Sequence, residues 1–265
     1  MRARRVSLPM ACAILLVSCG AIGPRPLIDD GSGRPKAVAA DHGAIPQSRH
    51  NRGVVTLVRV PLEPLPPRWR RDIIDTAAGA GYLSESERRL IVEINMVRTD
   101  PREYAQRFLV PLRPYYHGAL MERPGETTVA TREGIRALDA CIKDLQRATP
   151  VLPLSPKKGL TLAARDLARD QAKTGAMGHT GSDGSTDVDR INRYGRWDIC
   201  AGENIDYGHQ DARRIVISLL IDDGVPSRGH RRNLLDAAFR FVGVCIGPHP
   251  VYGHMCVMDF AGSYR

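Results

Sequence analysis

The pattern of apolar and polar positions predicts a series of amphipathic helices from residue 84 onward. Ser84 and Glu87 have the spacing of a capping box, and apolar residues follow at helical spacing through Val97. Similar signals recur along the chain. They predict a helix from Pro101 to about residue 108, one over Ile135–Leu145, one opened by Ser155-Pro156 and ended at Gly175, and one capped by Asp211 with Ile215, Val216, Leu219 and Leu220 facing the core.

Two β-type runs close the chain. Phe241–Ile246 and Met255–Phe260 are apolar, and the short connection between them predicts an antiparallel hairpin. Helices interleaved with a few strands favour an α+β or layered α/β/α domain.

The N-terminus has the features of an export signal. Arginines at positions 2, 4 and 5 precede the apolar stretch Leu8–Val17, which is too short to span a bilayer as a helix. Ser18-Cys19-Gly20 then resembles the bacterial lipobox, in which the cysteine becomes the lipidated first residue. We therefore predict a lipoprotein signal peptide over residues 1–18 and lipidation of Cys19. The alternative is an ordinary signal peptide with an incidental cysteine. Either way we expect export to a bacterial cell envelope, with a lipid anchor in a membrane, such as the outer membrane, or release as a secreted protein.

A tether is predicted between the signal and the folded domain. Residues 19–78 are rich in glycine, proline and arginine, and the proline-rich stretch Pro61–Pro67 is stiff. The folded domain is expected over residues 79–265.

Composition and charge add one exclusion. Hydrophobic residues make up 43% and charged residues 25% of the 265-residue chain, which is ordinary for a globular protein. The formal net charge is +9, or +6 without the three arginines of the signal segment, and it is spread over short basic pairs. Aromatic residues are only 5%, so a nucleic-acid partner is not expected.

Four cysteines follow Cys19. Cys141, Cys200, Cys245 and Cys256 are an even number in an exported protein, which suggests disulfides, and four cysteines allow three pairings. Cys245 and Cys256 flank the predicted hairpin turn, so we favour Cys245–Cys256, with Cys141–Cys200 by elimination. The alternative is buried thiols.

Three glycine-bearing motifs carry the candidate chemistry. His179 lies in Gly178–Ser185, Glu203 in Gly202–Ile205, and His230 in Gly229–Asn233. Imidazoles beside carboxylates suit a divalent metal ion or proton transfer near neutral pH.

In this order the motifs resemble those of the CAP superfamily, the cysteine-rich secretory, antigen and pathogenesis-related proteins. The resemblance also includes Asn95–Arg98 and the closing Val257–Phe260 strand, and it covers about residues 84–265. It implies a three-layer α-β-α sandwich with a small antiparallel sheet. It also implies a cleft with two histidines and two acidic residues that binds zinc or a similar ion in some members.

The resemblance assigns His179, Glu203 and His230 directly. For the fourth position the resemblance implies an acidic residue three positions after a tryptophan on the next helix. Asp222 occupies that register and is the candidate, with Asp223 as its alternate, although the tryptophan is absent here. Each of these residues also has a structural interpretation. His179 would cap a turn, Glu203 would bind backbone amides in a tight turn, His230 would start a helix, and the Asp222-Asp223-Gly224 stretch would end one. Asp183, Asp187 and Asp189 miss the EF-hand spacing, so turn and cap roles are expected for them. The connection from about 109 to 134 is an elaboration at the rim of the expected cleft.

Two functions follow from this set. One is a non-catalytic binding module for a lipid, a glycan or a protein, with or without zinc or another divalent metal in the cleft. The other is a metal-dependent hydrolase, in which His179, Glu203, Asp222 and His230 would be catalytic. The sequence has no His-Glu-x-x-His, Gly-x-Ser-x-Gly or P-loop motif, so binding is favoured and the question of catalysis stays open.

Overall fold

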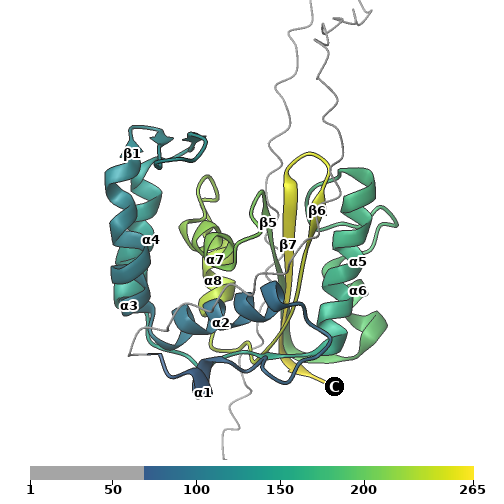
Figure 1. Ribbon diagram of the computed structural model, residues 1–265. Coiled ribbons are helices and arrows are strands. Elements are labelled where there is room, and N and C mark those ends of the chain that lie inside the picture. The colour runs from purple at the N-terminus through teal and green to yellow at the C-terminus, as the bar shows by residue number, and fades with distance from the viewer. Residues whose placement is uncertain (1–68) are drawn as a thin grey trace, which may run out of the picture. The chain divides into compact units, whose positions relative to one another are not determined.

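A four-stranded mixed sheet is the centre of the part of the chain that the computed structural model describes, residues 69–265 (Figure 1). Its strand order is β4-β6-β7-β5. The predicted signal peptide of residues 1–18, the predicted lipidation site Cys19 and the predicted tether up to residue 68 lie outside the described residues. None of the described helices is long and apolar enough to cross a membrane.

The predicted closing hairpin is confirmed and is longer than expected. β6 (Phe241–His249) and β7 (Gly253–Tyr264) pair antiparallel. β4 (Ser155–Pro156) pairs parallel with β6 at one edge, and β5 (Trp197–Tyr207) pairs antiparallel with β7 at the other. The sequence patterns did not indicate β5, although it carries Glu203.

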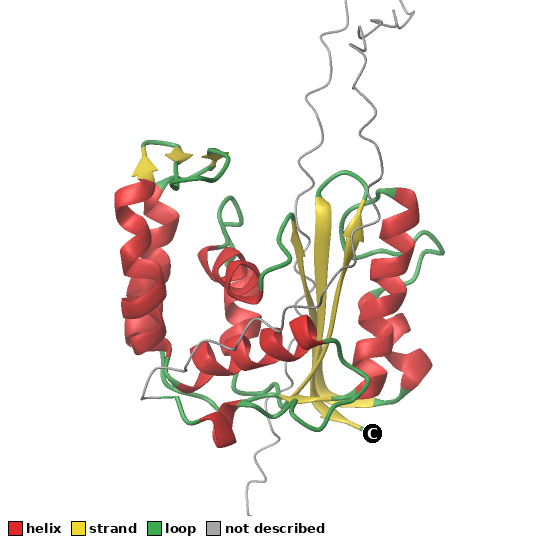
Figure 2. Cartoon of the chain, viewed as in Figure 1, coloured by secondary structure: helices red, strands yellow, loops and turns green. Residues whose placement is uncertain are grey.

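Helices cover both faces of this sheet (Figure 2). One face is covered by α5 (Lys158–Thr174), which contacts β6 and β7, and by α6 (Asp187–Tyr194), which packs on α5. The other face is covered by α2 (Glu85–Thr99), α7 (Ala212–Ile221) and α8 (Gly229–Leu235). The chain therefore has the predicted α+β, three-layer α-β-α sandwich fold.

Further short elements lie outside these layers. Helix α4 (Ile135–Arg147) packs against α7 and against a π-helical turn, η1 (Ala105–Leu109). The others are α1 (Arg71–Ile74), α3 (Pro101–Tyr104), the 3₁₀ helix η2 (Val110–Tyr115) and a three-stranded antiparallel sheet of β1 (Tyr116–His117), β2 (Leu120–Met121) and β3 (Val129–Ala130).

Three of the predicted helix starts are confirmed and one is wrong. Ser84 forms a complete capping box with Glu87, Asp100 caps the helix that begins at Pro101, and Asp211 accepts a hydrogen bond from the Arg214 amide. Ser155-Pro156 does not open α5, because the Ser155 amide donates to the Arg240 carbonyl, and this pairing with β6 makes the dipeptide a strand. Helix α5 begins three residues later, at Lys158.

The folded unit begins earlier than the predicted boundary at residue 79. Trp69 is buried, its indole N–H donates to the Met96 carbonyl (2.9 Å), and its ring stacks on Phe108. Ile74 and Ala77 are buried in the same core. Residues 69–78 thus belong to the domain rather than to the tether.

Arg98, near the end of α2, ties several loops to that helix. Its guanidinium is fully buried and donates to four main-chain carbonyls, those of Leu152 (2.9 Å), Leu234 (2.8 Å), Asp236 (3.0 Å) and Phe239 (3.0 Å). Burial lowers the pKa of Arg98 to about 10, so the side chain stays charged at neutral pH. The end of α8 and the approach to β6 are therefore held at fixed positions by one side chain.

The predicted disulfides are not formed. Cys141, Cys200, Cys245 and Cys256 are not joined to one another. In the β6–β7 register Cys245 lies opposite Val257, while Cys256 lies opposite Ile246. Because successive residues of a strand point to opposite faces, Cys245 enters the core under α5 and Cys256 enters the core on the α2 side.

The other predicted pair is also separated. Cys141 lies on α4 near Arg231 and Asp144, whereas Cys200 lies on β5 beside Gly262. Burial raises the pKa of the Cys141 and Cys245 thiols to about 12. Of the two interpretations, buried thiols describe this structure.

Gly243 on β6 sets how closely α5 approaches the sheet. A Cβ atom at this position would lie 2.0 Å from the Leu160 carbonyl carbon and 2.1 Å from the Thr161 nitrogen, both in the backbone of α5. Backbone atoms cannot move aside as a flexible side chain can, so the first turn of α5 requires glycine here.

We predict that Gly243→Ala lowers the free energy of unfolding by about 1–3 kcal/mol, because the added methyl group overpacks the α5–β6 contact. Gly247→Ala on the same strand is the matched control, since its added Cβ would meet only the Ala168 Cβ, at 4.0 Å. Urea unfolding of both variants measures the difference. Equal stability of the two variants would contradict the assigned role of Gly243.

Candidate functional site

Strand β5 presents its neighbouring residues to opposite faces of the sheet. Glu203 lies opposite Asp259 of β7 and faces α6, while Asn204 lies opposite Met258 and faces α8. Glu203 is therefore part of a strand and not of the tight turn considered from the sequence. Groups from both helical layers therefore reach this edge strand.

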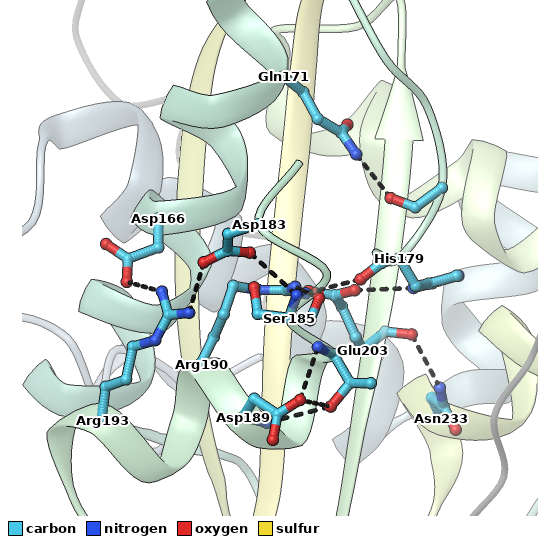
Figure 3. Close-up of polar contacts among 12 residues, drawn as sticks. Asp166, Gln171, His179, Asp183, Ser185, Asp189, Arg190, Arg193, Glu203 and Asn233 are labelled. Carbon is cyan, nitrogen blue, oxygen red and sulfur yellow. Dashed lines mark hydrogen bonds and ion pairs between the residues drawn. The ribbon is translucent and has the colours of Figure 1, made fainter. Parts of the chain in front are cut away.

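The first histidine pairs with Glu203. His179 follows α5 in the loop after Gly175, and its Nδ1 atom lies 2.8 Å from Glu203 Oε1. The second oxygen of Glu203 accepts from Arg190 Nη2 (2.8 Å), which also donates to the His179 carbonyl (3.0 Å) (Figure 3). The Glu203 and Arg190 side chains are each 1% exposed. A buried carboxylate is tolerated here because both of its oxygens have partners.

The loop before His179 is fixed by a closed ring of hydrogen bonds. Gln171 Nε2 donates to the Gly178 carbonyl (2.6 Å), and the Gly178 amide donates to the Tyr207 hydroxyl (2.9 Å). That hydroxyl donates in turn to Gln171 Oε1 (2.8 Å). The backbone on the N-terminal side of His179 is thus tied to both α5 and β5.

The second histidine pairs with Asp222. This residue ends α7 in the left-handed conformation (φ 56°), and α8 begins seven residues later at Gly229. Asp222 Oδ1 lies 2.7 Å from His230 Nδ1, and Oδ2 accepts from the His230 amide (3.0 Å). Asp222, the less secure fourth residue of the sequence prediction, is therefore the partner of His230. The helix-start role of His230 and the helix-end role of Asp222 are confirmed as well.

Two asparagines connect the histidine pairs. Asn204 Nδ2 donates to the His230 carbonyl (3.0 Å), and Asn233 Nδ2 donates to Asn204 Oδ1 (2.8 Å). His179 is held by Glu203 and His230 by the next residue, Asn204. Both histidines are thus anchored to consecutive positions of one strand.

In both pairs the Nδ1 atom faces the carboxylate. A carboxylate that accepts from Nδ1–H leaves the lone pair of a neutral imidazole on Nε2. Nε2 of His179 and Nε2 of His230 are buried and have no hydrogen-bond partner among the described residues. Unsatisfied buried polar atoms are rare in native proteins, so these two nitrogens mark the chemically available positions of the site.

The arrangement differs from the predicted shell of four ligands. Within residues 69–265 no group of three or more His, Cys, Asp or Glu side chains is arranged to hold a metal ion. The carboxylates of Glu203 and Asp222 lie against the Nδ1 atoms of the two histidines. They do not join the histidines in one set of metal ligands. Metal binding itself stays a prediction, with His179 and His230 as the two candidate ligands. Asp223, the alternate to Asp222, instead accepts from the amides of Arg132 and Glu133.

Two acidic residues beside Glu203 were not identified from the sequence. Asp259, quoted only as part of the closing strand, is fully buried. Burial and then the charge of Glu203 raise its pKa well above the ordinary range. Asp187, expected to cap or turn, is the first residue of α6, and the same two causes raise its pKa. The sequence did contain a signal for the burial of Asp259. It alternates with the apolar residues Val257 and Ala261, so it lies on the same buried face of the strand. Asp183 and Asp189 have the predicted turn and cap roles.

A third histidine–carboxylate pair lies at the end of β5. Asp206 is buried, and its oxygens lie 3.0 and 3.2 Å from Nδ1 of the half-exposed His209. The hydrogen bond that His209 donates to Asp206 raises the pKa of His209 above its ordinary value, against the opposing effect of partial burial. This pair is local, three residues apart, and no motif of the sequence indicated it.

We predict a pH-dependent contribution of His209 to stability. Because its pKa is higher in the folded state, the charged pair stabilises the fold fully below about pH 6.5, and this stabilisation is lost as the pH rises through the raised pKa. Thermal melting of wild type and His209→Ala should therefore differ more at about pH 5.5 than at about pH 9. In an Asp206→Asn background the pH-dependent part of the difference should vanish. A difference independent of pH would contradict the charged pair.

Comparisons with known proteins show the family to which this chain belongs. The family model of the cysteine-rich secretory protein family, CAP, matches residues 95–260. An extracellular protein containing an SCP domain from Bacillus anthracis str. Ames shares 24% identity with a TM-score of 0.36, over 48% of this chain and 39% of that one. An outer surface protein of Borrelia burgdorferi shares 21% identity with a TM-score of 0.34, over 41% of this chain and 76% of that one. The chain thus spans well under half the length of the Bacillus protein.

Comparison with curated proteins finds no match. The family match runs from α2 to β7 and includes both histidine pairs, His179 with Glu203 and His230 with Asp222. It spans more than half of the sequence. The chain belongs to the cysteine-rich secretory protein (CAP) family.

Proposed function

We propose that this protein is an exported, lipid-anchored CAP-domain protein that binds a divalent metal ion, zinc or a similar ion, through His179 and His230. In this proposal the site presents the ion and its surroundings to a lipid, a glycan or a protein, without catalysis. The observation that carries the proposal is the pair of buried Nε2 atoms without partners.

The donor set fits such an ion. Neutral imidazole nitrogens are common zinc ligands, and a histidine ligand usually donates its other ring N–H to a carboxylate, which fixes the tautomer and the ring orientation. Glu203 and Asp222 occupy this supporting position at 2.8 and 2.7 Å. A bound ion would also satisfy two acceptors that the described residues leave unpaired.

The hydrogen bonds of the carboxylates favour binding over catalysis. A general base needs an oxygen within reach of the proton that it abstracts. Glu203 uses one oxygen for His179 and the other for Arg190, and Asp222 uses one for the His230 ring and the other for the His230 amide. All four oxygens already have partners, so neither residue offers a ready base.

We predict that His179→Ala with His230→Ala abolishes zinc binding measured by calorimetry. Glu203→Gln and Asp222→Asn should each weaken it by about 10–100-fold, because the amide no longer supports the ligand nitrogen in the same way. His209→Ala is the matched control and should bind zinc as the wild type does, since His209 belongs to a separate pair. Equal zinc affinity in the double variant and the wild type would eliminate the metal proposal.

The alternative function is hydrolysis, and one observation favours it. Two protein nitrogens fill only part of a zinc coordination sphere, and catalytic zinc sites keep an open position. Bound zinc would supply Lewis-acid chemistry there, while His179 and His230 would hold it in place. Turnover of an envelope or extracellular substrate that is lost in His179→Ala or His230→Ala, with the fold intact, would replace the binding proposal by this one.

Export and anchoring rest on the N-terminal sequence. We predict that Cys19→Ala moves the protein from the membrane fraction to the soluble exported fraction, because a lipid-modified cysteine would be its anchor to the membrane. Mass spectrometry of the wild-type N-terminus should identify a lipid on Cys19. Cys12→Ala, within the same apolar segment, is the control and should leave the distribution unchanged. An unmodified N-terminus after cleavage would support the ordinary signal peptide instead.

A further inference from the structure

The segment between β3 and α4 contacts the loop that joins the two residues of the second pair. The amides of Arg132 and Glu133 donate to the Asp223 carboxylate, at 2.6 and 2.8 Å. Asp223 directly follows Asp222. The elaboration at residues 109–134 is therefore fastened to the loop over residues 222–228 at its base.

The Glu133 side chain adds hydrogen bonds in which the segment accepts and the loop donates. Its Oε1 atom accepts from the Gly224 amide (2.8 Å) and from Arg228 Nη1 (2.7 Å), and its Oε2 atom accepts from Arg228 Nη2. Such a bidentate, charge-assisted arrangement is geometrically specific. Hydrogen bonding to Arg228 lowers the pKa of Glu133 to about 2, so the carboxylate is charged over the working pH range of most proteins.

Arg228 connects Glu133 to the second histidine pair. Its Nη1 atom also donates to the Asp222 carbonyl (2.6 Å), and its own backbone leads directly into Gly229 and His230. Asp222 and Arg228 both have positive φ, 56° and 51°, a conformation that non-glycine residues adopt infrequently. The loop thus has an unfavourable backbone conformation at both ends, and the hydrogen bond from the Arg228 side chain to the Asp222 carbonyl joins these two positions.

We propose that Glu133 is a positioning residue for the Asp222–His230 pair. It orients Arg228, and Arg228 fixes the Asp222 carbonyl and the start of α8, so that Asp222 Oδ1 and His230 Nδ1 stay in contact. The role of His230 as a metal ligand rests on the proposed function, whereas the geometry of the Asp222–His230 pair does not.

A second carboxylate of the same segment provides a matched control. Glu126 pairs with Arg214, in the first turn of α7, and no hydrogen bond or ion pair joins Glu126 to the described loop over residues 222–228. Both glutamates link the segment to the body of the domain through an arginine. Only Glu133 reaches the loop of the second pair.

The test is the rate at which diethyl pyrocarbonate modifies each histidine, followed by mass spectrometry of the full-length protein. His230 is buried, so its rate reports the opening of this loop. In Glu133→Ala we expect the rate at His230 to rise about tenfold, from the loss of charge-assisted hydrogen bonds, with the rate at His179 unchanged. Glu133→Gln keeps one acceptor oxygen and should give an intermediate rise. Glu126→Ala should leave both rates at the wild-type values.

Two results would overturn the proposal. One is an unchanged His230 rate in Glu133→Ala. The other is a rise that is equal at His179 and His230, or equal in Glu126→Ala, because a general loosening of the domain would produce it. Should Glu133→Ala fail to fold, Glu133→Gln decides by the same criterion.

Zinc calorimetry on the same variants separates this proposal from the proposed function. If zinc binds, Glu133→Ala should weaken it by about tenfold, as expected for a residue that supports a ligand indirectly, and Glu126→Ala should not. If the wild type binds no zinc, the metal proposal fails, while the modification rates still decide the role of Glu133.

Discussion

The site depends on the two-residue alternation of an edge strand. In β5, Glu203 and Asn204 are neighbours in the chain, but their side chains leave the sheet on opposite faces. Each therefore meets a different helical layer and holds a different histidine. A shift of one residue in the β5–β7 register would turn Glu203 away from His179 and toward α8. The nine paired positions along β5 and β7 fix this register, and they thereby fix the geometry of the site as well as that of the sheet.

Buried arginines fix the segments around this strand. Arg190 connects the His179 carbonyl, the Ser185 carbonyl and Glu203. Arg98 binds four carbonyls, from the segment before β4, the end of α8 and the segment that follows α8. A planar guanidinium with five donors suits this role, because several irregular loops can share one rigid group. Removing one of these side chains would leave carbonyls or a carboxylate without a partner in the core. The loop that carries His179 and the helix that carries His230 are therefore held in place by charged groups inside the domain.

Local signals in the sequence predicted the helices well and the strands unevenly. Ser84, Asp100 and Asp211 bind amides a few residues away, so their cap roles are visible in the sequence. Strand β5 contains Gly202, Asn204 and two aspartates, residue types that are uncommon in strands, and it forms because β7 pairs with it. The same holds for Ser155-Pro156, whose helix-start pattern is overruled by pairing with β6. Cys245 and Cys256 flank a real hairpin, but the register directs their side chains to opposite faces.

By itself the sequence determined the class of fold. It also indicated three candidate site residues, His179, Glu203 and His230, and, through the family resemblance, a fourth at Asp222. These follow from motifs and periodicities that are local in the chain. Only the tertiary structure decided what the four residues do together. The pairing of Glu203 with His179 spans 24 positions and that of Asp222 with His230 spans eight, and both depend on where β5 and the end of α7 are held. Tertiary packing also brought Glu133 to Arg228, 95 positions away, and buried Asp259 beside Glu203. Such contacts are set by strand register and by buried hydrogen bonds between distant segments, which no single stretch of sequence encodes.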